Sequence, residues 1–172
     1  MTNFLHPSEK SGVVSIASCD TNIQVDAQYN PKELQIDKTV PWQKKSQANK
    51  TNETGIQLEF TGAEGRSMTL ELLFDGYETN SSVAGKVDTL NTMASVLNPG
   101  DKDETKRRPH LCVATWGGAL KGFQCVIENL TVKYTMFSKE GVPLRATCTV
   151  KLKEADAIST DDDGKGKYYG KR

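Results

Sequence analysis

Two histidines and four cysteines are the residues of this chain that are best suited to metal binding or nucleophilic chemistry. His110 and Cys112 form an H-x-C pair on one face of an expected strand, and Cys19 is a candidate third zinc ligand. Structural zinc sites usually contain two short ligand pairs, whereas Cys125 and Cys148 stand alone in the sequence. The pattern therefore favours a half-buried strand at His110, with the cysteines as reduced thiols, and predicts no metal and no cofactor.

Other patterns resemble ligand-binding motifs but lack a required residue. The run at 161–164, DDDG, would put Gly170 at position 12 of a calcium loop, where a bidentate Glu is needed. The glycines between 117 and 122 lack the Lys and the following helix of a phosphate-binding loop. No arrangement of nucleophile, base and orienting group is apparent in the sequence. We therefore predict no catalytic residue and a protein that is not an enzyme.

Length and charge limit the classes of function. A chain of 172 residues fits one domain, and its 22 basic and 22 acidic side chains cancel. Binders of nucleic acid or membrane surfaces need a basic excess, so neither nucleic-acid recognition nor membrane insertion is expected. The N-terminus, MTNFLHPSEK, has no apolar export signal, which predicts assembly in the cytoplasm. We expect a flexible lead-in over 1–12, a β domain over 13–154 and a polar tail over 155–172.

Alternation of apolar and polar residues predicts seven or eight strands in the β domain, because the side chains of a strand point alternately to its two faces. The pattern is clearest from Leu144 to Leu152, where every second residue is apolar. Between Phe123 and Met136 the apolar phase switches near Glu128–Asn129, as a β-bulge would cause. Cys125 and Cys148 are in phase with apolar neighbours and are predicted to lie in the core.

One hairpin and one helix complete the predicted elements. Residues 56–60 and 68–74 are expected to pair around the turn at 62–65. A helix is predicted after Ser81 or Ser82, either of which can cap it, and it ends before the turn at 98–100. Its apolar stripe is Val83, Val87, Leu90, Ala94 and Leu97. The chain is thus predicted to be mainly β, an antiparallel sandwich or barrel with one helix packed on it.

The polar stretch at 43–55 is the longest featureless segment within the domain, and loops of this length are usually functional or disordered. Trp42 precedes it and is either a subunit contact or a core residue, since Trp serves both roles. The lysines of this loop suit an acidic partner or simple solvation. The candidate subunit-interface residues are Trp42, Lys44, Lys45, Asn49, Lys50 and Asn52.

An ordered set of short motifs extends over residues 13–154. It comprises Tyr29-Asn30-Pro31…Leu34 followed by Trp42, then Leu70-Glu71-Leu72-Leu73-Phe74-Asp75 before the helix, and W-G…Y-T-x-F…G-x-P-x-R-A in the last third. The set resembles the tube and spike–tube adaptor proteins of contractile injection systems, which are phage-tail-like particles; the adaptors are related to phage baseplate tube-initiator proteins. The residues that carry the resemblance are Tyr29, Asn30, Pro31, Trp116, Gly117, Tyr134, Phe137, Gly141, Pro143 and Arg145.

The resemblance implies two packed antiparallel sheets with a flanking helix, and six copies joined edge to edge in a hexameric ring around a channel. It implies a structural protein at the base of the inner tube, a tube initiator that adapts a trimeric spike protein to the tube. Its expected partners are copies of itself, the spike, the inner-tube protein and other baseplate proteins. Adaptors often continue into a LysM-type module, whereas this chain ends in a short basic tail over 165–172, which favours a tube-like ring subunit.

Two other interpretations stay open at this point. The main inner-tube subunit uses the same barrel, and copy number per particle would separate it from an initiator. A free-standing β-sandwich that binds a small ligand or glycan is a different class. Such sites favour exposed aromatic residues around a groove, and a monomer in solution would favour this interpretation.

Overall fold

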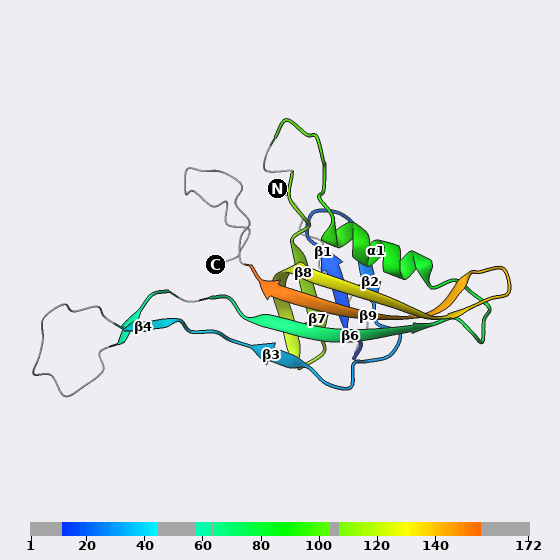
Figure 1. Ribbon diagram of the computed structural model, residues 1–172, viewed down its shortest axis with the longest axis horizontal. Helices are drawn as coiled ribbons and strands as arrows, with labels where there is room; N and C mark the ends of the chain where they lie inside the picture. Colours follow the sequence, from blue (N-terminus) through cyan, green and yellow to red (C-terminus); the bar gives the residue numbers. More distant parts are fainter. Residues whose placement is uncertain (1–11, 45–57, 63, 104–106, 156–172) are drawn as a thin grey trace, which may run out of the picture.

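The computed structural model describes residues 12–44, 58–62, 64–103 and 107–155 (Figure 1). Within these residues the chain is mainly β with one helix, and every strand pairing is antiparallel, as predicted. The elements in chain order are β1 (Ser15–Ser18), β2 (Gln24–Asp26), β3 (Gln35–Asp37), β4 (Trp42–Lys44), β5 (Leu58–Phe60), β6 (Ser67–Asp75), α1 (Ala84–Ala94), β7 (Cys112–Trp116), β8 (Leu120–Phe137) and β9 (Pro143–Glu154).

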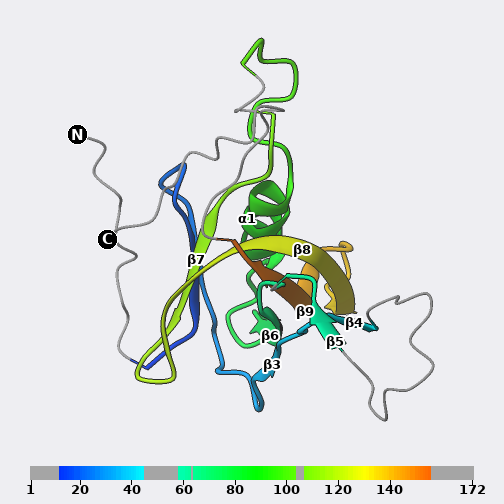
Figure 2. The same ribbon diagram turned by 90° about the vertical axis from the view of Figure 1, so that its left-hand side faces the viewer.

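Seven of the strands form one sheet in the order β2-β1-β7-β8-β9-β6-β3, and β4 and β5 form a separate pair. Strand β8 belongs to both halves of the large sheet: its first part pairs with β7, and its longer second part pairs with β9. The pairing register shifts between Ile127 and Asn129, so the predicted bulge is confirmed. Figure 2 shows β8 curving from one half of the sheet to the other.

The core lies between the two halves of this bent sheet, and α1 packs against β8, β2 and β9. The helix buries Val87, Leu90 and Met93, whereas Cys125 and Cys148 are buried in the sheet, as predicted. The helix ends at Ala94, so including Leu97 in it was wrong. The predicted serine cap was also wrong, because Val83 is the N-cap residue; the Ser82 hydroxyl accepts a bond only from the Ala84 N–H.

The predicted hairpin between 56–60 and 68–74 was wrong. Strand β6 pairs with β9 along its whole length and with β3 at its start, so β5 finds its partner in β4 instead. Strand β9 offers β6 nine paired residues, whereas β5 has only three residues in all. Together β4 and β5 form an arm that projects from the body of the molecule (Figure 1). The described residues therefore hold nine strands rather than seven or eight.

Gly76 closes the turn after β6 and tolerates no side chain. Its N–H donates to the Leu144 carbonyl (2.7 Å) and its carbonyl accepts from the Ser81 N–H (3.0 Å). A Cβ atom at Gly76 would lie 2.0 Å from the Ser81 carbonyl oxygen, whereas one at Gly85, in α1, would meet nothing within 4 Å.

We predict that Gly76→Ala lowers the free energy of unfolding by about 2 kcal/mol, because the backbone of this turn must move to admit the methyl group. The matched variant Gly85→Ala should raise it by about 0.5–1 kcal/mol through helix propensity. Urea unfolding of both variants measures the two changes. Equal stabilities for Gly76→Ala and the parent would contradict this description of the turn.

Candidate subunit interface

The arm has an exposed apolar face. Trp42 lies opposite Phe60 in the pairing and Lys44 lies opposite Leu58, so these four side chains share one face of the two-stranded ribbon. Trp42, Leu58 and Phe60 are 56%, 56% and 51% exposed, and the rings of Trp42 and Phe60 are 5.5 Å apart between centroids. A two-stranded ribbon has little core of its own, which makes this exposed apolar face a candidate contact surface.

The structure describes two of the predicted interface residues, Trp42 and Lys44. Trp42 is exposed, so its interpretation as a core residue was wrong, and Lys44 lies beside it on the arm. Leu58 and Phe60 share the exposed face of Trp42 but were not among the predicted interface residues, because the alternation at 56–60 predicted a hairpin with 68–74. Four predicted interface residues lie outside the described part of the chain: Lys45, Asn49, Lys50 and Asn52.

The second half of β8 is a sheet edge. From Glu128 onward, β9 is the only described strand that pairs with β8, because β7 ends its pairing at Cys125. Most side chains from Glu128 to Phe137 are exposed. Long unpaired edges of this kind invite pairing with another strand.

The hydrogen-bond alternation shows which backbone groups this edge presents. The N–H of Gly76 donates to the Leu144 carbonyl, so the even-numbered residues of β6 and β9 form the hydrogen-bonded pairs between these two strands. The odd-numbered residues of β9 therefore direct their N–H and C=O groups to β8. Thr131 lies opposite Thr149 and therefore bonds to β9. Leu130, Val132 and Tyr134 consequently direct their N–H and C=O groups away from β9, toward the open edge.

The opposite side of the sheet is protected. The Gln28 carboxamide bonds to the edge of β6 as a strand would, donating to the Asp75 carbonyl (2.7 Å) and accepting from the Asp75 N–H (2.9 Å). Continuing the register of β3 along β6 would bring Pro31 opposite Leu73, and proline has no N–H to donate. Among the described residues, only the short strand β3 and the arm beyond it extend from this side.

The outer face of the β8–β9–β6 region is polar and in places hollowed. Along β6 and β9 the buried and outward residues alternate, and an ion pair between Lys151 and Glu128 (2.8 Å) spans the outer surface. A groove of about 480 Å³ runs between residues 29–35 and this face. Side chains on this face include Thr69, Glu71, Lys133, Thr147, Thr149, Lys151 and Lys153.

Comparison with known proteins adds to this geometry. The family model for contractile injection system tube proteins matches residues 13–162, which is most of the chain. The chain belongs to this family. No curated protein matched the sequence. The family consists of structural tube proteins rather than enzymes.

Several motif residues of this tube protein shape its turns. Gly117 and Gly141 have positive φ angles, +45° and +80°, in the β7–β8 and β8–β9 turns, where other residues would be strained. Trp116 is half-buried against the core beside the first turn, and Pro143 begins β9 after the second. Tyr134 and Phe137 lie near the end of β8 with their ring centroids 6.2 Å apart.

Two further motif residues of the tube protein hold distant segments together. The Asn30 side chain donates to the Gly12 carbonyl (2.7 Å) and accepts from the Val14 N–H (3.2 Å), which fixes the start of the domain. Arg145 donates to the Asp75 carboxylate (2.9 Å) across β9 and β6, and this bond lowers the pKa of Asp75. Tyr29, next to Asn30, is exposed, and Pro31 is buried.

In the tube protein, the candidate zinc ligands His110 and Cys112 lie beside an ion pair between Arg108 and Asp20. Arg108 and Asp20 make two bonds of 2.8 Å, and the Leu111 N–H donates to the same carboxylate (2.8 Å). Burial alone would raise the pKa of Asp20, but these bonds hold it below the usual value. The Cys112 thiol donates to the His110 carbonyl. Within the described ranges, no group of three or more potential ligands could hold a metal.

His110 is buried in this cluster and acts as a hydrogen-bond acceptor. The Ser18 hydroxyl oxygen accepts from the N–H groups of Asp20 and Thr21 (both 3.1 Å), so its own hydrogen is free for His110 Nδ1, 2.7 Å away. This bond requires an unprotonated Nδ1. Burial lowers the pKa of His110, and the nearby Asp20 carboxylate offsets only part of that shift.

Among the described elements, α1 is the only helix, and no helix there is long and apolar enough to span a membrane.

The lowered pKa of His110 predicts a loss of stability in mild acid. As the pH falls below about 6.5, the unfolded chain binds a proton at His110 that the folded ring does not, so the free energy of unfolding falls. Urea unfolding between pH 7 and 5 measures this slope, and His110→Gln should reduce it. His6→Gln is the control for the other histidine. A slope unchanged in His110→Gln would show that the ring is not held neutral.

Proposed function

We propose that six copies of this chain close into a ring at the base of the inner tube, where the ring adapts a trimeric spike to the tube. The open edge of β8 is the observation that carries this proposal. The backbone groups of Leu130, Val132 and Tyr134 that face this edge are paired by no described strand and suit a strand of a second copy, and the family is one of tube proteins. Closing a ring removes every such edge.

The two sides of the sheet suit ring closure because they differ. One copy offers the open edge of β8, and the next offers β3 on the far side of β6. An interface between two different surfaces closes into a ring when the rotation per copy divides a full turn. The buried face of the sheet packs on β1, β7 and α1, so the outer polar face would line the channel.

The ring would act mechanically rather than chemically. One of its faces would contact the spike and the other the tube, and the sheath, built from other proteins, would drive both forward on contraction. A wall of threonines and charged residues stays hydrated and gives a moving cargo few apolar contacts. The proposed role requires rigidity, which the long paired strands β8 and β9 supply.

The second candidate is the main subunit of the inner tube. Membership in the family of contractile injection system tube proteins favours it directly. Both candidates use the same ring, and they differ in whether one ring or many assemble.

Negative-stain imaging with mass measurement, on the purified protein alone and with its spike protein, tests the two candidates. We expect six-fold rings that form only with the spike if the chain is the initiator. Long tubes formed by the protein alone would support the main subunit instead. A monomer under both conditions would contradict both and favour the ligand-binding sandwich.

A proline at Val132 tests the edge itself. The N–H of Val132 faces the open edge, so Val132→Pro should remove one intermolecular donor while leaving the bonds to β9. We expect a folded protein that forms no rings under conditions where the parent does. Circular dichroism reports the fold, and imaging reports the rings.

The matched control is Val132→Ala. It loses a similar amount of side-chain packing, since Val132 is partly buried against the core, but it keeps the N–H. Rings in Val132→Ala and none in Val132→Pro would support strand pairing at this edge. Normal rings in a folded Val132→Pro would exclude it.

A further inference from the structure

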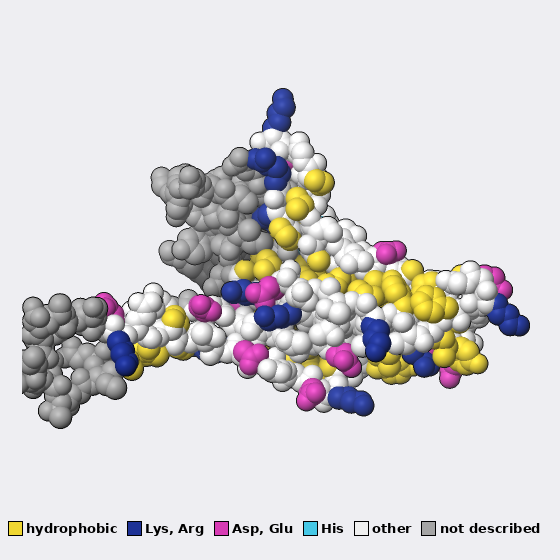
Figure 3. Space-filling view, in the orientation of Figure 1, with side chains coloured by type: hydrophobic (Ala, Val, Ile, Leu, Met, Phe, Trp, Pro, Cys, Tyr) yellow, Lys and Arg dark blue, Asp and Glu magenta, His cyan; other side chains and the backbone are white. Residues whose placement is uncertain are grey.

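Two buried cysteines lie opposite each other where β7 pairs with the first part of β8. The register places Cys112 opposite Cys125, so both side chains point to the same face of the sheet. Both are 0% exposed and add nothing to the surface in Figure 3. Cys148, by contrast, lies opposite Leu72 and Val132. All four cysteines are free thiols in this structure, so the pair at Cys112 and Cys125 is unbonded.

The hydrogen-bond pattern indicates how far apart the two cysteines are. The Cys19 N–H donates to the Leu111 carbonyl (2.7 Å), so odd-numbered residues of β7 direct their backbone groups to β1, and Cys112 directs its groups to β8. Cys112 and Cys125 therefore form a hydrogen-bonded pair, in which the Cα atoms are about 5.5 Å apart. Disulfides usually join Cα atoms that are about 4.4–6.8 Å apart. The backbone thus has the spacing of a disulfide already.

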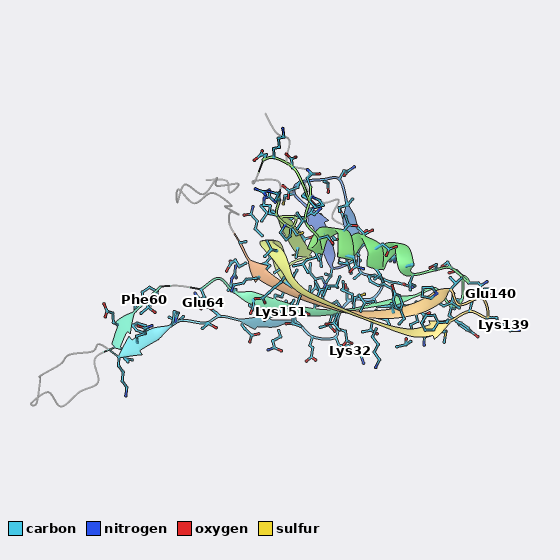
Figure 4. The ribbon with its side chains drawn as sticks, turned by 45° about the horizontal axis from the view of Figure 1, so that its top comes forward. Lys32, Phe60, Glu64, Lys139, Glu140 and Lys151 are labelled. Atoms are coloured by element: carbon cyan, nitrogen blue, oxygen red, sulfur yellow. The ribbon has the colours of Figure 1, made fainter. Side chains whose placement is uncertain are left out.

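The pair lies beside the bend of β8. The pairing of β8 with β7 ends at Cys125, and its pairing with β9 begins there. Figure 4 shows the strand continuing from this region to the turn that carries Lys139 and Glu140. A covalent bond at Cys125 would therefore fix the point at which β8 passes from one half of the sheet to the other.

Burial keeps both thiols unreactive once the protein is folded. It raises the pKa of Cys112 to about 12 and also raises the pKa of Cys125, so the thiolate that attacks a disulfide is scarce at neutral pH. The Cys112 thiol instead donates to the His110 carbonyl, a contact that a disulfide would replace. Oxidation is therefore expected while the chain folds, before the core closes over the two sulfur atoms.

We propose that Cys112 and Cys125 form a stabilising disulfide when the chain folds in the presence of a small-molecule disulfide such as oxidised glutathione. One cysteine thiolate attacks the glutathione disulfide, which forms a mixed disulfide and releases one glutathione thiolate. The other cysteine thiolate then attacks the protein sulfur of the mixed disulfide and releases the second glutathione. Two protein thiols are oxidised, one glutathione disulfide is reduced, and the two thiol protons pass to the released glutathione thiolates.

The bond makes the bend of β8 sensitive to the surroundings in which the chain folds. A chain folded under reducing conditions keeps both thiols, whereas a chain folded under oxidising conditions has β7 tied to β8. The inference concerns one chain, so it holds whether or not the proposed ring forms.

Refolding of the full chain from urea tests the inference. The parent and two variants, Cys125→Ser and Cys148→Ser, are refolded with oxidised and reduced glutathione, alkylated, and digested with trypsin. Lysine and arginine residues separate the four cysteines in the sequence, so each cysteine lies on its own tryptic peptide. The expected linked peptides are 108–121 and 122–133. Cys148→Ser is the matched control, because it removes a buried cysteine but keeps the pair.

We expect the parent and Cys148→Ser each to lose two alkylatable thiols and to give the linked peptides, whereas Cys125→Ser gives none. Circular dichroism checks the fold, and the linked parent should have a higher urea midpoint than the parent kept in reductant, because the bond restricts the unfolded chain. If Cys125→Ser does not fold, the linked peptides of the parent decide.

Four alkylated cysteines in the refolded parent, glutathione retained on the protein, or a link that includes Cys19 or Cys148 would overturn the inference. A linked parent that does not regain its fold, or that shows no rise in the urea midpoint, would overturn it as well.

Discussion

The backbone of β8 imposes the constraint on which the rest of the structure depends. Each N–H and C=O group of a strand requires a hydrogen-bond partner or water, and the two parts of β8 meet this requirement differently. Its first part pairs with β7, one edge of its second part pairs with β9, and the other edge has no strand in the described residues. The bend between the two parts creates the core and also leaves the edge open.

The remaining features fit this edge. The Gln28 carboxamide occupies the backbone groups of Asp75 at the edge of β6, which limits pairing with another strand on that side of the sheet. The outer face of β6 and β9 is polar, whereas one face of the arm exposes Trp42, Leu58 and Phe60. The proposed ring would pair the open edge of β8 with a second copy of the chain.

Periodicity in the sequence predicted what depends on local order. The bulge near Asn129, the burial of Cys125 and Cys148, and the single helix all follow from the phase of apolar residues. Periodicity cannot specify which strands pair, so Leu58 and Phe60 were assigned to a core hairpin instead of the arm. It also cannot detect contacts across long separations, such as the ion pair between Asp20 and Arg108 or the carboxamide of Gln28 on β6. Motif resemblance identified the family, and the geometry of the site came only from the structure.

Amide hydrogen exchange at β8 tests the central claim most directly. In dissociated protein, the amides of Leu130, Val132 and Tyr134 should exchange quickly, while those of Thr131 and Lys133 are protected by β9. In the assembled ring, all five should be protected. Fast exchange at Leu130, Val132 and Tyr134 in the assembled state would contradict the claim that this edge joins the subunits.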